Sequence, residues 1–308
     1  MNDERKPLDA LAVGAMLILC LIWSLQQIVL KATSGDMAPV LQIGLRSGAA
    51  AVLVTLMVLL RSRRLAISAG AWKPGLLAGL LFAAEYLLVG ESLRLTSAAH
   101  VVVFLYTAPV FAALGLHLLL PAERLAWGQW LGIGLAAAGI AVAFLRPGES
   151  AGDDVSRMLL GDMMALGAGA LWGLTTVVIR CTRLSVTPPS EALLYQLLSA
   201  FVLLVSAAFL MGQAQVRWTG ALAASLLFQS VIVAFLSFLV WFWLLRHYQA
   251  SRLGVFSFAT PLFGVLLGAF LLQEAIEPRF VMGAILVLCG ITLVSTYGWL
   301  HQWLTRQR

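Results

Sequence analysis

The second half of the chain repeats the first, and this repeat is the strongest constraint on the fold. Three residues recur at a constant offset of 149 positions: Trp23, Lys31 and Pro39 return as Trp172, Arg180 and Pro188. Later matches keep the same order, namely Ala108-Pro109 with Thr260-Pro261, Glu123 with Glu274, and Gly132/Gly139 with Gly283/Gly290. We therefore divide the chain into two repeats, residues 1–146 and 159–308, joined by an acidic, glycine-containing linker at 147–158.

Both repeats consist mainly of long apolar runs. Hydrophobic residues make up 61% of the 308 positions and charged residues only 11%. A soluble domain cannot hide that much apolar surface, whereas a bilayer accepts it on every outward face. Each run is close to the roughly 20 residues that a helix needs to cross a membrane. The sequence predicts an all-α polytopic membrane protein with ten transmembrane helices, at about 10–30, 38–60, 74–93, 97–119, 126–145, 159–180, 189–211, 220–245, 251–272 and 279–299.

The basic residues between the runs predict the orientation. With the N-terminus inside, 13 Lys and Arg residues fall on the cytoplasmic side and 6 on the outer side, so both termini are expected in the cytoplasm. Each repeat has an odd number of runs, so the second repeat enters the bilayer from the opposite side. Such an inverted repeat is an arrangement that secondary transporters use for alternating access, with the binding site near the midplane.

Two charged residues lie inside the predicted spans, where charge is expensive. Arg46 and Glu85 belong to consecutive spans that run in opposite directions. At about 1.5 Å rise per residue, both lie roughly 12–14 Å below the outer surface. One interpretation is a structural ion pair that neutralises both charges. The other is that they line a cavity, where they bind a zwitterion or relay a proton.

Five aromatic residues also lie deep in the predicted spans. Trp23 and Trp172 are related by the repeat, and Tyr195 takes the place in the second repeat that Arg46 has in the first. These residues either pack the interior or form a pocket whose rings stack on a flat ligand. We name as candidate substrate-binding residues Trp23, Arg46, Glu85, Tyr86, Tyr106, Trp172 and Tyr195.

One histidine, His100, lies near the outer end of the fourth span. We expect it to be a water-exposed residue at the rim rather than a proton carrier. Because imidazole titrates near neutral pH, His100 is nevertheless kept beside Glu85 as a candidate proton-linked residue.

Prolines and glycines recur symmetrically in the two repeats. Pro109 and Pro261 lie in the middle of the fourth and ninth spans, where a proline kinks a helix, so they form either a pair of hinges or a pair of rigid bends. Glycines at close-packing spacing let helix backbones approach each other, either within each repeat or at a dimer face. The protein is thus expected to be a monomer or a homodimer. These glycines are Gly75/Gly79, Gly264/Gly268, Gly132/Gly139 and Gly283/Gly290.

Enzymatic signatures are missing from the sequence. It contains no P-loop, no HExxH, no GxSxG and no Rossmann glycine pattern, and its three cysteines are scattered in apolar runs. We therefore predict no catalytic residue, no cofactor and no metal. The net charge of +6 comes from short loops, which indicates topology rather than nucleic-acid binding. The expected partners are a small-molecule substrate and the lipid bilayer. A membrane-embedded enzyme for lipid or quinone chemistry and a channel-like or sensory protein are the alternatives.

The chain resembles the EamA-type branch of the drug/metabolite transporter superfamily. The resemblance covers the whole chain and rests on the order of Trp23, Lys31, Leu45-Arg46, Ala108-Pro109 and Glu123, followed by Trp172-Gly173, Thr260-Pro261 and Glu274. It is most similar to bacterial aromatic amino acid exporters of the YddG type. The resemblance implies a bacterial inner-membrane protein in which spans 1–4 and 6–9 surround a central cavity and spans 5 and 10 sit outside it as a scaffold. It also implies a role near the path for Trp23, Arg46, Tyr86, Tyr106, Trp172, Tyr195, Pro109 and Pro261. It implies export of amino acids, aromatic ones first, or of related metabolites; multidrug export is the alternative within this fold. The replacement of Arg46 by Tyr195 in the second repeat makes the expected cavity asymmetric in charge.

Overall fold

The computed structural model describes residues 9–62, 68–121, 124–144, 153–248, 256–257 and 259–306. These residues form helices and no β-strand; an isolated antiparallel bridge joins Met37 and Val216. The elements, in chain order, are α1 (Ala10–Ala32), α2 (Pro39–Ser62), α3 (Trp72–Leu95), α4 (Ala98–Leu105), α5 (Ala108–Leu119), α6 (Trp127–Phe144), α7 (Asp153–Cys181), η2 (Arg183–Val186), α8 (Pro189–Leu210), α9 (Gly220–Leu227), η3 (Phe228–Leu236), α10 (Ser237–His247), α12 (Ala259–Leu271) and α13 (Pro278–Arg306).

The helices are apolar enough to cross a bilayer. In the described residues, eight helical stretches have the length and composition of membrane spans, and two shorter apolar helices cover Trp127–Ala143 and Ala259–Leu271. The predicted all-α membrane class is thus confirmed, while the count of ten spans stays a prediction. Leucine and valine side chains remain exposed along the outer helix faces, as expected for contact with lipid rather than water.

Side chains cap several of these helices at loops. The Asp9 carboxylate accepts from the Ala12 amide at 2.8 Å at the start of α1, and Ser97 and Thr219 accept in the same way at α4 and α9. Such caps satisfy amides that have no partner inside the helix. α7 begins at Asp153, inside the predicted linker 147–158, and residues 145–152 lie outside the described part of the chain. The division into two domains stays a prediction.

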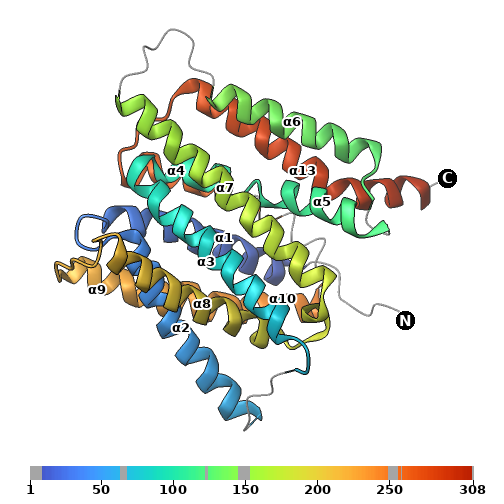
Figure 1. The fold of residues 1–308 in the computed structure, drawn as a ribbon. Helices are drawn as coiled ribbons and strands as arrows, with labels where there is room; N and C mark the ends of the chain where they lie inside the picture. Colours follow the sequence, from blue (N-terminus) through green and yellow to red (C-terminus); the bar gives the residue numbers. More distant parts are fainter. Residues whose placement is uncertain are drawn as a thin grey trace.

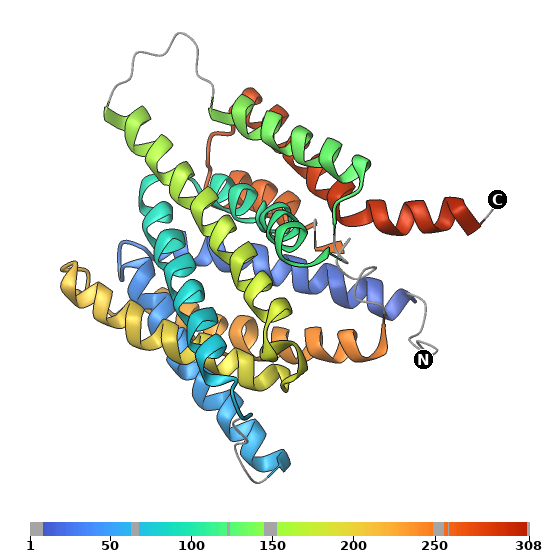
Figure 2. The ribbon, with the colours of Figure 1, turned by 45° about the vertical axis from the view of Figure 1, so that its right-hand side comes forward.

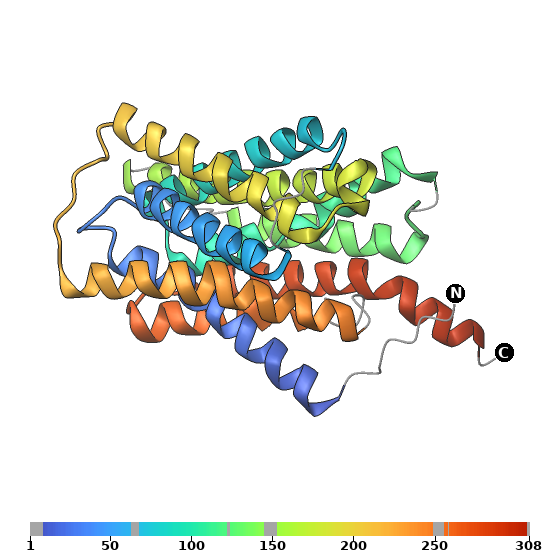
Figure 3. The ribbon, with the colours of Figure 1, turned by 90° about the horizontal axis from the view of Figure 1, so that it is seen from below.

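The two chain ends define the sides of the molecule. α1 begins and α13 ends on the same side, which we call the terminal side, and the opposite side is the far side (Figures 1 and 3). α3 and α7 lie against each other near the centre, and α6 and α13 form a pair at the periphery (Figures 1 and 2). α6 and α13 correspond to the predicted spans 5 and 10, whose scaffold role outside the cavity stays a prediction.

The fourth predicted span is broken rather than kinked. α4 ends at Leu105, Tyr106 and Thr107 form a turn, and Pro109 lies in the first turn of α5. Pro261 likewise lies in the first turn of α12. The prediction of mid-helix kinks was therefore wrong, because proline is well tolerated in a first helical turn, where its missing N–H leaves no bond broken. The hinge role of both prolines remains a proposal.

Another irregularity lies in the eighth predicted span, which runs through α9, η3 and α10. η3 is a π-helix of nine residues, in which the backbone bonds reach one residue further than in an α-helix. Nothing in the apolar sequence of this span indicates it. The wider turns place Gln229 in the buried interior opposite α2.

The glycine pairs lie at contacts between the two sequence repeats. A Cβ atom added to Gly139 of α6 would come within 2.6 Å of the Gly283 carbonyl oxygen of α13, so only glycine allows this approach. Gly75 and Gly79 face Tyr195 and Ser199 of α8 in the same way. The glycines therefore join the halves of one chain, an arrangement that the sequence alone had not singled out.

Candidate functional site

The buried guanidinium of Arg46 is held by two elements. Its Nη1 donates to Gln229 Oε1 of η3 at 3.1 Å, and its Cζ lies 4.8 Å from the centre of the Tyr86 ring. Gln229 is itself fixed, because its Nε2 donates to Ser225 Oγ at 3.0 Å. Arg46 is only 4% exposed. The structure therefore brings together a charge from α2, a ring from α3 and an amide from η3.

Glu85 lies close to this group but does not pair with it. The carboxylate is 3% exposed and interacts electrostatically with Arg46, yet the two side chains form no ion pair within 4.0 Å. Among the described residues, Glu85 Oε2 has no hydrogen-bond partner. The structural ion pair considered from the sequence is thus not formed, and the Glu85 carboxylate is left incompletely satisfied.

An aromatic pair joins α7 to the turn between α4 and α5. Tyr106, in the turn between α4 and α5, meets Trp172 of α7 edge to face at 5.3 Å between ring centres. Two glycines of α7 let this helix pass close to the turn and to α5, and so position Trp172. An added Cβ at Gly169 would lie 2.7 Å from Thr107 Oγ1, and one at Gly173 would lie 2.7 Å from Phe111 Cβ. The break in the fourth span and the glycines of α7 thus place this pair.

A cavity of about 480 Å³ opens beside Trp172 in the terminal half. It lies among α5, α6, α7, α10 and α13, and Pro109, Thr176, Trp241 and Ser257 contribute to its wall. Trp23 stands behind Trp241, 5.9 Å away between ring centres, and its Nε1 donates to Ser237 Oγ at 3.0 Å. The cavity falls in the roughly 300–1,000 Å³ range of small-molecule pockets.

Tyr195 lies apart from the Arg46 group. It packs on α3, where an added Cβ at Gly75 would lie 2.5 Å from its ring, and it does not line either cavity described here. In an inverted repeat, equivalent positions fall in opposite halves of the membrane. The sequence offset therefore relates Tyr195 to Arg46 without bringing them together.

His100 is not a rim residue. It is 5% exposed, its Nδ1 lies 2.9 Å from both carboxylate oxygens of Asp162, and its ring stacks on Phe280 at 3.7 Å. Thr96 Oγ1 donates to Asp162 at 2.6 Å. The expected exposure of His100 was wrong because α7 and α13 cover this end of α4. Sequence reasoning missed Asp162, although an acidic residue inside a predicted span was a usable signal.

Further bonds close the far half. Lys31 of α1 donates to the carbonyl oxygens of Leu93 and Thr96, and the Glu274 carboxylate accepts from the amides of Ala98 and Ala99 at 2.7 and 3.1 Å. An acidic side chain at the start of α4 is favourable because the helix dipole is positive there. These contacts join α1, α3 and α4 to the segment after α12.

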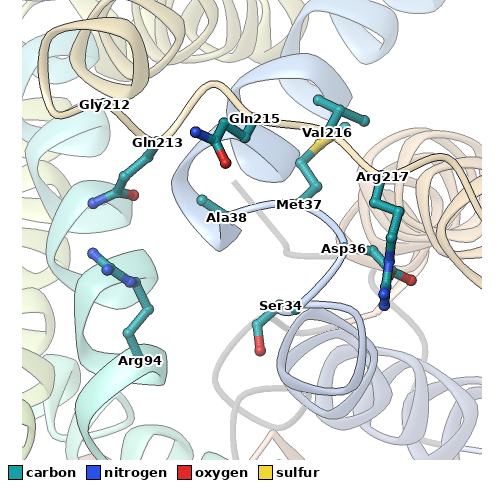
Figure 4. A pocket seen from close by; sticks show the side chains of 11 residues that line it. Ser34, Asp36, Met37, Ala38, Arg94, Gly212, Gln213, Gln215, Val216 and Arg217 are labelled. Carbon is teal, nitrogen blue, oxygen red and sulfur yellow. The ribbon is translucent and has the colours of Figure 1, made fainter.

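A second cavity, of about 380 Å³, lies on the far face between the loop after α1 and the loop after α8. Figure 4 shows Arg217 against Asp36 at one end and Arg94 near Gln213 at the other. Arg217 Nη2 and Thr219 Oγ1 each donate to the Asp36 carboxylate at 2.6 Å. Hydrogen bonds from Thr219 and then Arg217 lower the pKa of Asp36 below its usual range. We call Asp36, Arg217 and Thr219 the loop clasp.

Two stretches of the sequence, residues 10–145 and 159–296, match the EamA-like transporter family. The chain belongs to this family. A Bacillus subtilis protein named "Uncharacterized transporter YoaV" is 25% identical over 88% of this chain and 92% of its own length. A Pseudomonas aeruginosa protein named "Uncharacterized protein PA1977" is 30% identical over 96% of both chains. A solved structure titled "Crystal structure of protein" has a TM-score of 0.64 and covers 94% of this chain and 98% of its own, at 20% identity, which supports the fold alone.

Membership in the EamA-like transporter family confirms the family that the sequence resemblance indicated. The protein is a multi-pass membrane transporter, with a lipid environment and a small-molecule substrate. The double match agrees with the internal repeat. Family and relatives indicate transport rather than enzymatic chemistry.

Proposed function

We propose that this EamA-like transporter exports amino acids, aromatic ones first, or related small metabolites across the bacterial inner membrane. The observation that carries the proposal is the cavity beside Trp172, with Trp172 and Trp241 in its wall, together with the buried charged residues Arg46 and Glu85 in the same helical bundle. An aromatic amino acid has the same two parts, a flat ring and a charged end. Rings pack favourably edge to face or offset-stacked, and a charged end needs buried polar partners.

The uneven packing of the two halves supports alternating access. The terminal half contains the cavity, whereas buried hydrogen bonds close the far half. With both termini in the cytoplasm, as the basic residues predict, this conformation is open to the inside and ready to load substrate. The inverted repeat supplies the opposite conformation, because exchanging the conformations of the two repeats opens the other side.

A flux assay in proteoliposomes tests the proposed function. Vesicles with purified protein are loaded with labelled phenylalanine or threonine, and efflux is compared with that from protein-free vesicles. We expect saturable efflux that increases with unlabelled substrate on the opposite side, because a carrier returns faster when loaded. If neither amino acid moves faster than in protein-free vesicles, the amino acid assignment is wrong. Flux without saturation or trans-stimulation would indicate a channel instead.

Repeating the assay with an imposed pH gradient separates facilitated from proton-driven export. A thermal-shift panel of nucleosides and cationic drugs covers the alternative of a metabolite or multidrug exporter with the same fold. Stabilisation by those compounds without stabilisation by amino acids would favour the alternative.

A further inference from the structure

We infer that Glu85 is the binding site for a primary ammonium group of the substrate. This inference rests on the proposed function and identifies the part of the substrate that the buried centre recognises. Glu85 lies in the middle of α3, and only 3% of the residue is exposed. Its Oε2 has no hydrogen-bond partner among the described residues. Leaving such a carboxylate oxygen unsatisfied is costly, so a ligand donor at this position stabilises the complex.

Arg46 does not fill this role. Its guanidinium donates to Gln229, lies over the Tyr86 ring, and forms no ion pair within 4.0 Å of Glu85. Gln229 Nε2 in turn donates to Ser225 Oγ at 3.0 Å and lies 3.4 Å from Gln42 Oε1. This network orients Arg46 from the α2 and η3 side. Arg46 is therefore a positioning residue that keeps its charge near Glu85 without neutralising it by contact.

Other unpartnered atoms near the centre are acceptors as well. Among the described residues, Thr260 Oγ1 and Gln27 Oε1 are buried without a hydrogen-bond partner. Thr260 lies beside the Tyr106 hydroxyl, although the two do not form a hydrogen bond of regular geometry, and Tyr106 in turn interacts with Glu85. Gln27 lies one turn along α1 from Ser24, which donates to the Thr260 carbonyl. The unsatisfied carboxylate oxygen of Glu85 calls for a ligand that donates hydrogen bonds.

A primary ammonium meets this need better than a hydroxyl or an amide. It carries three donors and a positive charge, whereas a hydroxyl carries one donor and no charge. Its hydrogen bonds to a carboxylate are charge-assisted and therefore stronger than neutral ones. Tyr106 contacts Trp172, which lines the terminal cavity, whereas Glu85 lies outside the lining of that cavity. The inference therefore places the ring of an aromatic amine on the cavity side of Tyr106 and its ammonium at Glu85.

A ligand series on the wild-type protein tests the inference directly. Phenylethylamine keeps the ring and the ammonium of phenylalanine but lacks the carboxylate, and phenylpropionate keeps the carboxylate but lacks the ammonium. Each is measured as a stabiliser in thermal-shift titrations and as an inhibitor of phenylalanine efflux. We expect phenylethylamine to bind at least about 10-fold more tightly than phenylpropionate, the usual effect of a charge-assisted hydrogen bond. Equal or tighter binding of phenylpropionate overturns the inference.

Glu85→Gln and Glu91→Gln form a matched pair on the same helix. Glu91 lies near the far end of α3, where it pairs with Arg94 and accepts from Gln213. We expect Glu85→Gln to weaken phenylethylamine binding about 10-fold or more and Glu91→Gln to leave it unchanged. Unchanged binding in Glu85→Gln shows a neutral, packed carboxyl group and overturns the inference. Should Glu85→Gln fail to fold, Glu85→Asp and the wild-type ligand series decide the result.

The two hypotheses fail in different ways. If phenylalanine efflux is absent but phenylethylamine stabilises the wild type and not Glu85→Gln, the amino acid export proposal is wrong and the ammonium site stands. If phenylalanine is exported and phenylpropionate competes as well as phenylethylamine, export stands and the ammonium site is wrong.

Discussion

The far and terminal halves of this transporter each contain parts of both sequence repeats, but they are packed differently. The far half is closed by buried polar contacts, with the pair of His100 and Asp162 at its centre. The terminal half contains the cavity beside Trp172. The repeat does not extend to this pair, because the residue 149 positions before Asp162 is Val13, which cannot form the same bonds. The far half therefore has a buried polar contact that the repeat does not supply at the equivalent position.

Cysteine labelling gives the largest contrast between the halves. In a background with Cys181 and Cys289 replaced by serine, both exposed in the structure, we expect Thr176→Cys to react almost completely with a polar maleimide. Ser92→Cys should stay unlabelled, because Thr176 lines the terminal cavity and Ser92 is fully buried in the far half. Labelling is done on protein in detergent, where the maleimide reaches both faces of the molecule, and mass spectrometry measures the labelled fraction at each position. Equal labelling of the two positions would contradict the closed far half.

Asp162→Ala should cause the largest loss of stability. Removing the Asp162 carboxylate leaves the buried His100 and Thr96 without their hydrogen-bond partner, and each unsatisfied group costs about 1–3 kcal/mol. Asp162→Asn should lose less, because its amide oxygen can still accept from Thr96. Denaturation of the purified protein measures both, with Glu91→Ala as a control for removing a carboxylate from a partly exposed pair. In the Asp162→Ala background we also expect Ser92→Cys to become labelled. Wild-type stability in Asp162→Ala would mean that other contacts hold the far half together.

Trp172→Ala should weaken transport while leaving membrane insertion intact. An aromatic contact contributes about 0.5–1.5 kcal/mol beyond the area it buries, so the KM of phenylalanine efflux should rise about two- to tenfold. Trp127→Ala is the matched control, because Trp127 is 74% exposed on α6. Equal kinetics for Trp172→Ala and Trp127→Ala would assign Trp172 to packing alone.

The loop clasp should have the smallest effect. Arg217 is 77% exposed, so Arg217→Ala should shift the melting temperature at pH 7 by about a degree or less. The contacts of Asp36 lower its pKa, so their stabilising effect is present above the usual aspartate pKa of about 4 and is lost as pH falls through the lowered value. The difference between wild type and Arg217→Ala should therefore shrink in acid. A difference that grows below pH 4 would contradict the clasp.

The sequence predicted the helices and the family because both depend on local composition and on the order of motifs. Apolar runs of the right length define spans, and the repeated tryptophans and prolines indicate the family. The sequence also predicted that Arg46 and Glu85 lie at similar depth in the membrane. It did not predict the turn at Tyr106, because an apolar run looks the same whether one helix or two pass through it.

Pairing between distant segments was beyond sequence reasoning. His100 and Asp162 are 62 positions apart, and their contact depends on how α4 meets α7. Tyr195 was placed with Arg46 through the repeat, but an offset in sequence carries no information on which neighbour a side chain faces. Gln229 was recognised as polar, yet its contact with Arg46 depends on the π-helix.

The π-helix η3 also limits how this chain can tolerate changes in length. Deleting one residue inside η3 would allow an uninterrupted α-helix and would rotate every later residue of this span by about 100°. Ser237 would turn away from Trp23, and Trp241 would leave the cavity wall, although neither residue had been altered. Related chains of this family that lack this extra residue should therefore present a different set of side chains to their substrates.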